Sequence, residues 1–272
     1  MRPHPVRSRG LKALKGAEMD KALYEEMYRL EQHHWWFAAK RSIVLSLLEK
    51  FLPACQPADT KPRVIDAGCG CGMMLSDLAA HGYDAVGIDA SDLAIQFCRA
   101  RGIQVARGEL PGQVDLPPDS SDAVLMLDVL EHVEDDKAAF AAALAIVRPG
   151  GIMICTVPAY GWLWTRRDEF HHHKRRYSMG RFREVLSSAA DVQPLLVSFM
   201  NTFLFPLALG GRLASKLLDS GEKPTDLSIP PAGLNAMLKS IYQSERVLLG
   251  YGLTLPFGLS LVAVVRKAGS QP

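Results

Sequence analysis

Val64-Ile65-Asp66-Ala67-Gly68-Cys69-Gly70-Cys71-Gly72 is the stretch of sequence that decides the fold. Its first half is a short apolar run, and its second half has the spacing G-x-G-x-G. Glycines at such a position let the backbone turn sharply and let a ligand approach the N–H groups that open a helix. Residues 73–81 then show helical periodicity, so the stretch predicts a strand, a tight turn and a helix, with a ligand at the turn.

The alternation of short apolar runs with amphipathic segments continues along the chain. Runs of strand character lie at residues 63–66, 83–89, 103–106, 123–127 and 152–157, and helical segments lie at residues 73–81, 92–101 and 135–147. Strands that alternate with helices at this spacing form βαβ units and a parallel sheet. Residues 192–199 and 259–266 are the expected sixth and seventh strands. The predicted fold class is α/β, with a mostly parallel seven-stranded sheet that carries helices on both faces.

Three segments are expected along the chain. Residues 1–19 form a basic tail that holds Arg2, Arg7, Arg9, Lys12 and Lys15. This tail is expected to be disordered, and contact with a membrane surface or a nucleic acid is the alternative. Residues 20–61 are expected to form an N-terminal helical cap. Residues 62–272 form the main α/β domain, with a helical insertion at about residues 201–252 before the last strand.

The composition excludes several classes of protein. The 272 residues are 48% hydrophobic and carry a formal net charge of +2, so the chain is neither disordered as a whole nor a general binder of polyanions. No nucleic-acid partner is therefore expected. Five cysteines at irregular spacing, with no apolar run after the basic tail, indicate the reducing cytoplasm. No metal site is predicted, because Cys69 and Cys71 lack a second cysteine or histidine pair at zinc spacing.

Two acids indicate which ligand the glycine turn binds. Asp66 precedes the glycines by two residues, and a carboxylate there is poorly placed beside the pyrophosphate of a dinucleotide. It suits a ligand that has an ammonium group and no phosphate. Asp89 ends the second predicted strand, where a carboxylate accepts hydrogen bonds from both hydroxyls of a ribose. A nucleoside that carries an amino acid in place of phosphates is S-adenosylmethionine, which is the predicted cofactor.

Together with further motifs, this pattern resembles the class I S-adenosylmethionine-dependent methyltransferase family, whose fold is Rossmann-like. The resemblance spans residues 63–158. It rests on five motifs in order: the stretch quoted above, Gly87-Ile88-Asp89, Gly108-Glu109-Leu110-Pro111, Asp128-Val129-Leu130-Glu131-His132-Val133, and Val147-Arg148-Pro149-Gly150-Gly151. The resemblance implies roles for seven residues: Asp66, Gly68, Gly70 and Gly72 at the methionine end of the cofactor, Asp89 at the ribose, Glu109 at the adenine edge, and Asp128 on the sulfonium side.

Flanking segments are similar to one bacterial subgroup of this family. They are His34-Trp35-Trp36-Phe37 with Lys40-Arg41, and Asp168 followed by His173-Lys174-Arg175-Arg176-Tyr177. Members of the subgroup often accompany surface-glycan and lipid pathways. The resemblance therefore implies an acceptor that is a small molecule or is linked to a lipid or a glycan.

Two histidines are the candidate catalytic residues. His132 follows the fourth predicted strand, at the sheet edge where the ligands of open α/β sheets bind, and His173 lies in a basic loop. Histidine is the side chain best matched to proton transfer at neutral pH. A hydrogen-bonded structural role for His132 is an equal alternative.

The basic loop also contains the candidate substrate-binding residues Arg175, Arg176 and Tyr177. Two adjacent guanidinium groups can bind a carboxylate or a phosphate through paired hydrogen bonds. A solvated loop that packs as a lid is the alternative. A metal site built from the three consecutive histidines 171–173 is not expected, because adjacent side chains diverge.

The predicted function is a cytoplasmic methyltransferase that uses S-adenosylmethionine to methylate an oxygen or a nitrogen atom. A catalytically silent cofactor-binding or scaffold protein is the alternative, and an NAD-dependent oxidoreductase is disfavoured by the glycine spacing. In the insertion, a helix with Leu207 on its apolar face and Arg212 and Lys216 opposite either packs over the acceptor cleft or rests on the inner face of a membrane. The oligomeric state is left open.

Overall fold

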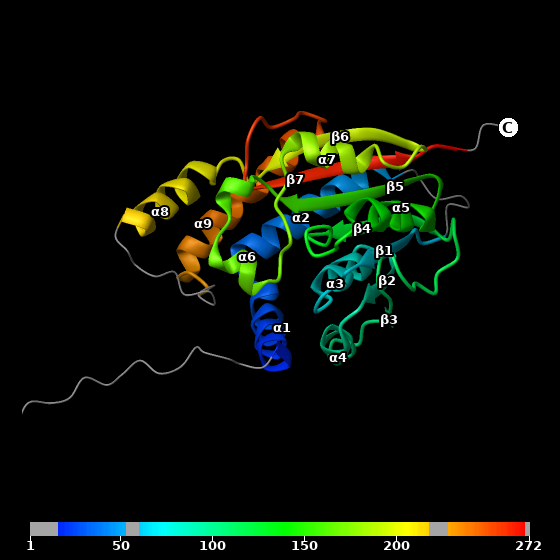
Figure 1. The fold of residues 1–272 in the computed structure, drawn as a ribbon, viewed down its shortest axis with the longest axis horizontal. Coiled ribbons are helices and arrows are strands. Elements are labelled where there is room, and N and C mark those ends of the chain that lie inside the picture. The colour runs from blue at the N-terminus through cyan, green and yellow to red at the C-terminus, as the bar shows by residue number, and fades with distance from the viewer. Residues whose placement is uncertain (1–15, 53–59, 218–227, 270–272) are drawn as a thin grey trace, which may run out of the picture.

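A single seven-stranded sheet with helices on both faces forms the centre of the protein (Figure 1). The computed structural model describes residues 16–52, 60–217 and 228–269, and within these it describes the side chains of residues 21–52, 60–211 and 228–269. The strands are β1 Arg63–Ala67, β2 Asp84–Asp89, β3 Val105–Arg107, β4 Ser121–Leu127, β5 Val147–Pro158, β6 Val192–Met200 and β7 Ser260–Lys267.

The order of the strands in the sheet is β3-β2-β1-β4-β5-β7-β6. Strands β1 to β5 are parallel, and β7 runs antiparallel between β5 and β6. The chain winds outward from β1 in one direction to β3, then returns to β4 on the other side of β1. Ligands of open α/β sheets bind at such a reversal, outside the carboxyl ends of the strands. The predicted mixed, mostly parallel sheet is confirmed.

Ten α-helices and one 3-10 turn surround the sheet in the described residues. They are α1 Gly16–His33, α2 Trp35–Phe51, α3 Met73–Ala80, α4 Asp92–Ala100, α5 Asp136–Ile146, the turn η1 Gly161–Leu163, α6 Arg166–Phe170, α7 Met179–Leu186, α8 Phe205–Leu217, α9 Ala232–Gln243 and α10 Glu245–Gly250. Local sequence sets several of their starts. The side chains of Ser91, Asp135 and Ser178 each accept a hydrogen bond from a backbone amide of the first turn that follows.

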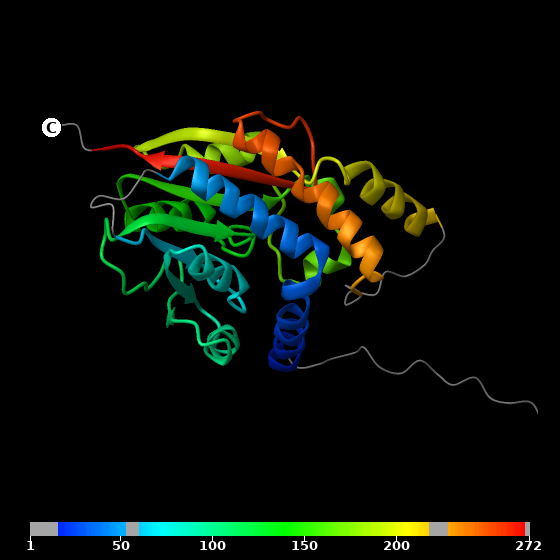
Figure 2. The same cartoon turned by 180° about the vertical axis from the view of Figure 1, so that it is seen from behind.

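Two apolar cores lie on opposite faces of the sheet. Successive strand residues point to opposite faces, and in β4 Val124 belongs to one core while Ala123 and Leu125 belong to the other. Phe140 of α5 and Val185 of α7 pack in the first core, and residues of α2, α3 and α9 pack in the second. Figure 2 shows α2 crossing one face of the sheet, and α9 packs against α2. A strand that is buried on both faces reads as a continuous apolar run, as the sequence of β4 does.

Some predicted boundaries change in the structure. Helix α1 begins at Gly16, so residues 16–19 are helical rather than part of a disordered tail. The basic residues of that tail lie outside the described part of the chain, and so do the side chains of Arg212 and Lys216. The segment Arg148-Pro149-Gly150-Gly151 lies inside β5, where it forms an irregularity in the pairing with β4. The helical insertion between β6 and β7 is present as α8, α9 and α10.

None of the helices in the described residues combines the length and the apolar character that crossing a bilayer requires.

Candidate active site

The predicted cofactor residues of β1, β2 and β4 come together at one edge of the sheet. Because these strands are parallel neighbours, their carboxyl ends lie side by side. Asp66 pairs with Gly87 in the β1–β2 register, and the amides of Gly68 and Cys69 both donate to the carbonyl of Ile88, at 2.8 and 3.1 Å. The glycine turn is therefore fastened directly to the end of β2.

Glycine is required at two positions of this turn. Gly68 has a φ of +79°, and a Cβ atom there would lie 2.5 Å from Cγ2 of Val129. Gly72 has a φ of +84°, and its Cβ atom would lie 2.8 Å from the sulfur of Cys98. Side chains at these positions would be strained by the left-handed backbone and would collide with neighbours. The predicted turn is thus formed by the backbone. The expectation that its N–H groups are open to a ligand is not met at four of them, because the amides of Gly68, Cys69, Gly70 and Gly72 are bonded to Ile88, Asp89 and Cys69.

Asp89 connects the glycine turn to the start of α4. One carboxylate oxygen accepts from the amide of Gly70 and the other accepts from the amide of Ser91, each at 2.9 Å. Burial raises the pKa of Asp89, and these backbone donors oppose the rise. Each carboxylate oxygen has a second lone pair. Asp89 is therefore held in place with capacity left for the two hydroxyls of a ribose.

Asp66 lies in an environment that favours a cationic ligand. Its side chain is buried, with 2% of the residue exposed. Burial and the nearby carboxylates of Asp89 and Glu31 raise the pKa of Asp66 to about 7, and the ammonium of Lys40 opposes this rise. In the described residues Lys40 is paired with Asp128 and Glu31 with Arg101, so Asp66 and Asp89 are left without an ion pair and leave an excess of negative charge. The ammonium group of an amino acid would relieve it, so these residues fit the methionine end of S-adenosylmethionine.

Asp128 stands at the end of β4 in a left-handed conformation with a φ of 55°. Its amide donates to the carbonyl of Thr156 at 3.0 Å, the Thr156 hydroxyl donates to its carboxylate at 3.0 Å, and the ammonium of Lys40 forms an ion pair with it. Burial would raise the pKa of Asp128, but the Lys40 ammonium overcomes this effect and holds it below its usual value. The Asp128 carboxylate is therefore held in place near the middle of the sheet edge that the carboxyl ends of the parallel strands form.

Lys40 is a site residue that the sequence analysis did not select. It lies on α2 with 6% of its surface exposed, and its nitrogen is 4.9 Å from the centre of the Trp36 ring. Trp36 and Lys40 are four residues apart and share a helix face. That spacing was visible in the sequence, but the partner carboxylate of Asp128 lies 88 residues away along the chain.

Helix α1 covers the glycine turn. A Cβ atom on Gly70 would lie 3.2 Å from the terminal methyl of Met27, and the thiol of Cys71 donates to the carbonyl of Tyr24 at 3.5 Å. Arg101 at the end of α4 pairs with Glu31 at 2.7 Å and lies over the ring of Tyr28. The helical cap thus closes the cofactor edge from the side opposite the sheet. Glu109, the predicted adenine contact, is exposed in the loop after β3.

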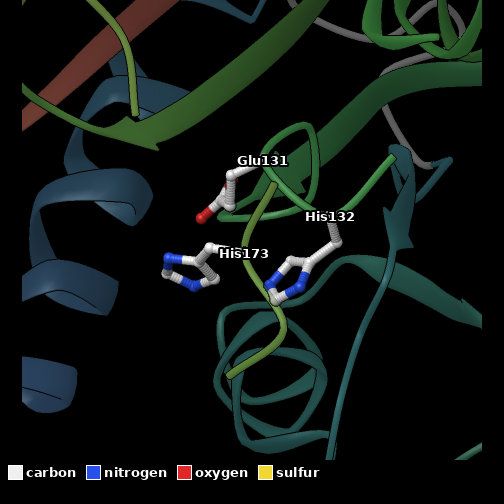
Figure 3. Close-up of side chains that lie close together, drawn as sticks. All are labelled: Glu131, His132 and His173. Atoms are coloured by element: carbon white, nitrogen blue, oxygen red, sulfur yellow. The ribbon is translucent and has the colours of Figure 1, made fainter. Parts of the chain in front are cut away.

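A second cluster lies beside Asp128 and consists of Glu131, His132 and His173 (Figure 3). One ligand-type atom from each of the three lies within 4.8 Å of the others, and the two imidazole centres are 4.7 Å apart. The amide of Lys174 donates to the Glu131 carbonyl at 2.8 Å, which fastens the loop of His173 to the turn after β4. The two predicted catalytic histidines are therefore neighbours. Glu131, which was not predicted as a site residue, lies close to both of them.

Glu131 is buried without a polar partner. The residue is 1% exposed, and neither carboxylate oxygen has a hydrogen-bond partner among the described residues. Burial and the charge of Asp128 raise the pKa of Glu131 well above its ordinary value. Buried polar groups are nearly always paired, so an orphaned carboxylate calls for an explanation.

His173 is held by a network behind it. Its Nδ1 lies 2.9 Å from Oδ1 of Asp168. The guanidinium of Arg176 donates to both oxygens of Asp168, at 2.7 and 3.0 Å, and the amide and hydroxyl of Thr165 donate to Oδ2 at 2.8 and 3.0 Å. Burial acts to raise the pKa of Asp168, but these donors hold it far below its usual value. The imidazole of His173 is thereby fixed in orientation, with Nε2 as the nitrogen left for other contacts.

The predicted substrate-binding residues Arg175, Arg176 and Tyr177 make contacts within the domain. Arg176 is engaged with Asp168, Arg175 lies 3.1 Å from a carboxylate oxygen of Asp136, and Tyr177 is fully buried with its hydroxyl donating to Asp136 at 3.0 Å. Their polar groups are thus used to hold the loop against the domain. These contacts favour the alternative of a packed loop, and the binding of an anionic acceptor by these three residues stays a prediction.

The family is established by comparison with known proteins. The family model described as a methyltransferase domain matches residues 34–190, which is more than half of the 272 residues. The chain therefore belongs to the methyltransferase domain family, and its sheet is the Rossmann-like sheet of class I S-adenosylmethionine-dependent methyltransferases.

Curated relatives include ubiquinone biosynthesis O-methyltransferases of bacteria. The protein from Methylococcus capsulatus is 30% identical over 135 residues, which cover 46% of this chain and 57% of the relative. The protein from Alkalilimnicola ehrlichii is 35% identical over 98 residues, which cover 34% of this chain and 40% of the relative. The chain thus spans about half the length of these relatives.

Solved structures share the fold. A Mesorhizobium loti S-adenosylmethionine-dependent methyltransferase has a TM-score of 0.52 and 18% identity, over 83% of this chain and 98% of its own. Haemonchus contortus phosphoethanolamine N-methyltransferase 2, solved with S-adenosylmethionine, has the same score and identity over 83% of this chain and 52% of its own. A Haloferax volcanii methyltransferase solved with the Trm112 activator has a TM-score of 0.57 at 18% identity, over 94% of this chain and 98% of its own.

Proposed function

We propose that the protein is an S-adenosylmethionine-dependent methyltransferase that methylates a hydroxyl oxygen of a small-molecule or lipid-linked acceptor. The observation that carries the proposal is the group of acids at the switch point of the sheet. Asp66 and Asp89 flank a glycine turn that has no bulky side chains to keep a ligand from the backbone, and Asp66 lies in a field that favours a cation. A nucleoside with a cationic amino acid matches both ends of this site.

The proposed contacts follow from the positions of the residues. The ammonium of the methionine part lies near Asp66, the ribose hydroxyls donate to Asp89, and the glycine turn of Gly68, Gly70 and Gly72 passes under the ligand. Glu109 remains the proposed contact for the adenine edge, and Asp128 remains the proposed contact on the sulfonium side. S-adenosylmethionine supplies a methyl group that a positive sulfur has already activated.

The chain's own residues mainly align the acceptor and exclude water, because methyl transfer is an in-line displacement. The acceptor oxygen forms a bond to the methyl carbon, and the carbon–sulfur bond breaks with its electron pair going to sulfur. The hydroxyl proton passes from the acceptor to water. No nucleophile on the protein is required. His132 and His173 lie beside Asp128 on the side of the sheet edge where we place the acceptor.

Two features support a lipid-linked acceptor. The relatives from Methylococcus capsulatus and Alkalilimnicola ehrlichii are named for ubiquinone biosynthesis, which suggests by analogy a ring hydroxyl as the acceptor. In addition, the large apolar side chains that lie exposed in the described residues all belong to residues 162–164 or 203–257: Trp162, Trp164, Phe203, Leu207, Ile229, Leu234, Met237, Val247, Tyr251, Leu253 and Phe257. Exposed apolar side chains gathered in one region mark an interaction surface. We propose that this region contacts a membrane peripherally.

Calorimetric titration with S-adenosylmethionine tests the cofactor part of the proposal. Asp89→Ala should weaken binding by about tenfold or more, because two charge-assisted hydrogen bonds to the ribose are lost. The matched control is Asp84→Ala, which removes an exposed acid from the opposite end of the same strand and should leave the affinity unchanged. No binding by the wild type, or equal affinity in Asp89→Ala, would contradict the proposal.

Flotation with phospholipid vesicles tests the membrane part. Wild-type protein should float with the vesicles, and Leu234→Ser/Met237→Ser should remain in the dense fraction, because both side chains are at least 43% exposed on α9. Equal flotation of both proteins would refute the proposal that Leu234 and Met237 contact the membrane. It would leave the cofactor site untouched.

A further inference from the structure

The cluster of Glu131, His132 and His173 is not explained by methyl transfer alone. A buried carboxylate with two unpartnered oxygens points toward two imidazoles from different parts of the chain (Figure 3). Desolvating a carboxylate without a hydrogen bond is costly, and native proteins rarely leave one in that state. Something that the protein binds at this place is therefore expected to complete the cluster.

The three side chains form a recognised set of metal ligands. A carboxylate oxygen and two imidazole nitrogens bind zinc in several hydrolytic enzymes, with a further position open for water or substrate. In a tetrahedral site with zinc–nitrogen bonds of about 2.1 Å, neighbouring ligand atoms lie about 3.4 Å apart. The ligand atoms here lie within 4.8 Å of one another, so modest side-chain rotations close the site around an ion.

The surroundings of His173 add a second, independent observation. Histidines that bind a metal through one nitrogen usually donate the other N–H to a carboxylate. Asp168 stands in that place at 2.9 Å from Nδ1, and Arg176 and Thr165 hold Asp168 in turn. This arrangement fixes the neutral tautomer that leaves Nε2 as the ligand. His132 is exposed, which gives an ion a path of entry from solvent.

We propose that Glu131, His132 and His173 bind one divalent transition-metal ion of the zinc type, with at least one coordination position open to an oxygen of the acceptor. The sequence predicts no metal, since consecutive histidines diverge. The proposed site avoids that divergence because it uses only one histidine of the run, together with Glu131 and His132 from the turn after β4.

The role of the ion rests on the proposed function, whereas its binding does not. A hydroxyl that is bound to a divalent ion loses its proton more readily than a free hydroxyl. The ion would orient the acceptor oxygen and favour its ionised form, while the proton passes to water. His132 and His173 would bind the ion through the nitrogen lone pairs that a general base needs. In this proposal they are therefore metal ligands and do not act as bases.

Cobalt titration tests the binding without cofactor or acceptor. Protein treated with a chelator should take up about one Co²⁺ ion and develop the visible absorption of cobalt bound by nitrogen and oxygen ligands. His132→Ala, whose side chain is exposed, should fold normally and weaken binding by about tenfold or more; His173→Ala and Glu131→Gln should do the same. The matched control is His81→Ala at the exposed end of α3, which should bind cobalt as the wild type does.

The outcomes separate this inference from the proposed function. No cobalt absorption in the wild type, or equal affinity in the wild type, His132→Ala and His173→Ala, would overturn the metal site. Titration of the same samples with S-adenosylmethionine reports the cofactor site independently, and His132→Ala should retain that binding. Cobalt binding without cofactor binding would sustain the metal site and refute the proposed function. Cofactor binding without cobalt binding would overturn the metal site and leave the proposed function standing.

Discussion

Binding of S-adenosylmethionine should be linked to a proton at Asp66. Burial and the neighbouring carboxylates raise the pKa of Asp66 to about 7, so the free protein carries this group partly protonated at neutral pH. A cationic ammonium favours the ionised carboxylate. The cofactor should therefore bind more tightly as the pH rises through this range, and binding should release a proton.

The expected size of the effect follows from the pKa. A group with a pKa of about 7 is ionised in about one molecule in eleven at pH 6 and in about half of the molecules at pH 7. If only the ionised form binds the ammonium, the apparent affinity should rise about fivefold between these two pH values, which is about 1 kcal/mol. At pH 7 the wild type should release about half a proton per cofactor bound.

Calorimetry in two buffers of different ionisation enthalpy measures the proton release directly. Asp66→Asn should abolish the release and weaken binding by about tenfold or more at pH 7, since a charge-assisted hydrogen bond is lost. Asp84→Ala, which removes an exposed acid on β2, should behave as the wild type. An unchanged pH dependence in Asp66→Asn would refute the reasoning and would assign the proton to Glu31, whose pKa burial also raises to about 7.

Three further substitutions have definite expected results. Gly68→Ala should lower the free energy of unfolding by about 2 kcal/mol or more and abolish cofactor binding in calorimetry, because its Cβ would lie 2.5 Å from Val129 on a left-handed backbone; Gly68→Ala/Val129→Ala should recover only part of the stability. Lys40→Met should cost about 2–3 kcal/mol in urea denaturation by leaving the Asp128 carboxylate unpaired, and Lys40→Met/Asp128→Asn should recover most of it. Tyr177→Phe should cost about 1–2 kcal/mol through the lost buried hydrogen bond and leave cofactor affinity unchanged; a selective loss of acceptor binding would contradict its structural role.

The fold was predictable from the sequence because its signals are local. The apolar runs of β1 and β4 and the glycine turn at Gly68 are each complete within about ten residues. The alternation of strands and helices then limits the topology to a few parallel arrangements. The antiparallel placement of β7 between β5 and β6 was not predicted, since no local pattern encodes it.

The site was predictable only in part because its pairings are long-range. Asp66 and Asp89 were found from their positions at the carboxyl ends of strands. The ion pair of Lys40 with Asp128 joins residues 88 positions apart, and no periodicity connects them. Arg176 has the side-chain chemistry of a residue that binds an anionic substrate, yet its guanidinium donates a hydrogen bond to the buried carboxylate of Asp168. Which of several charged residues turns inward depends on the packed loop, and a single sequence does not specify it.

A crystal structure with S-adenosylhomocysteine bound tests the central claim most directly. The ligand should lie at the carboxyl ends of β1 and β2, with both ribose hydroxyls within hydrogen-bonding distance of the Asp89 carboxylate and its amino group on the side of Asp66. Its sulfur should point toward Asp128 and the turn that carries His132. A ligand seated elsewhere, or one whose ribose makes no contact with Asp89, would contradict the assignment of this edge as the cofactor site.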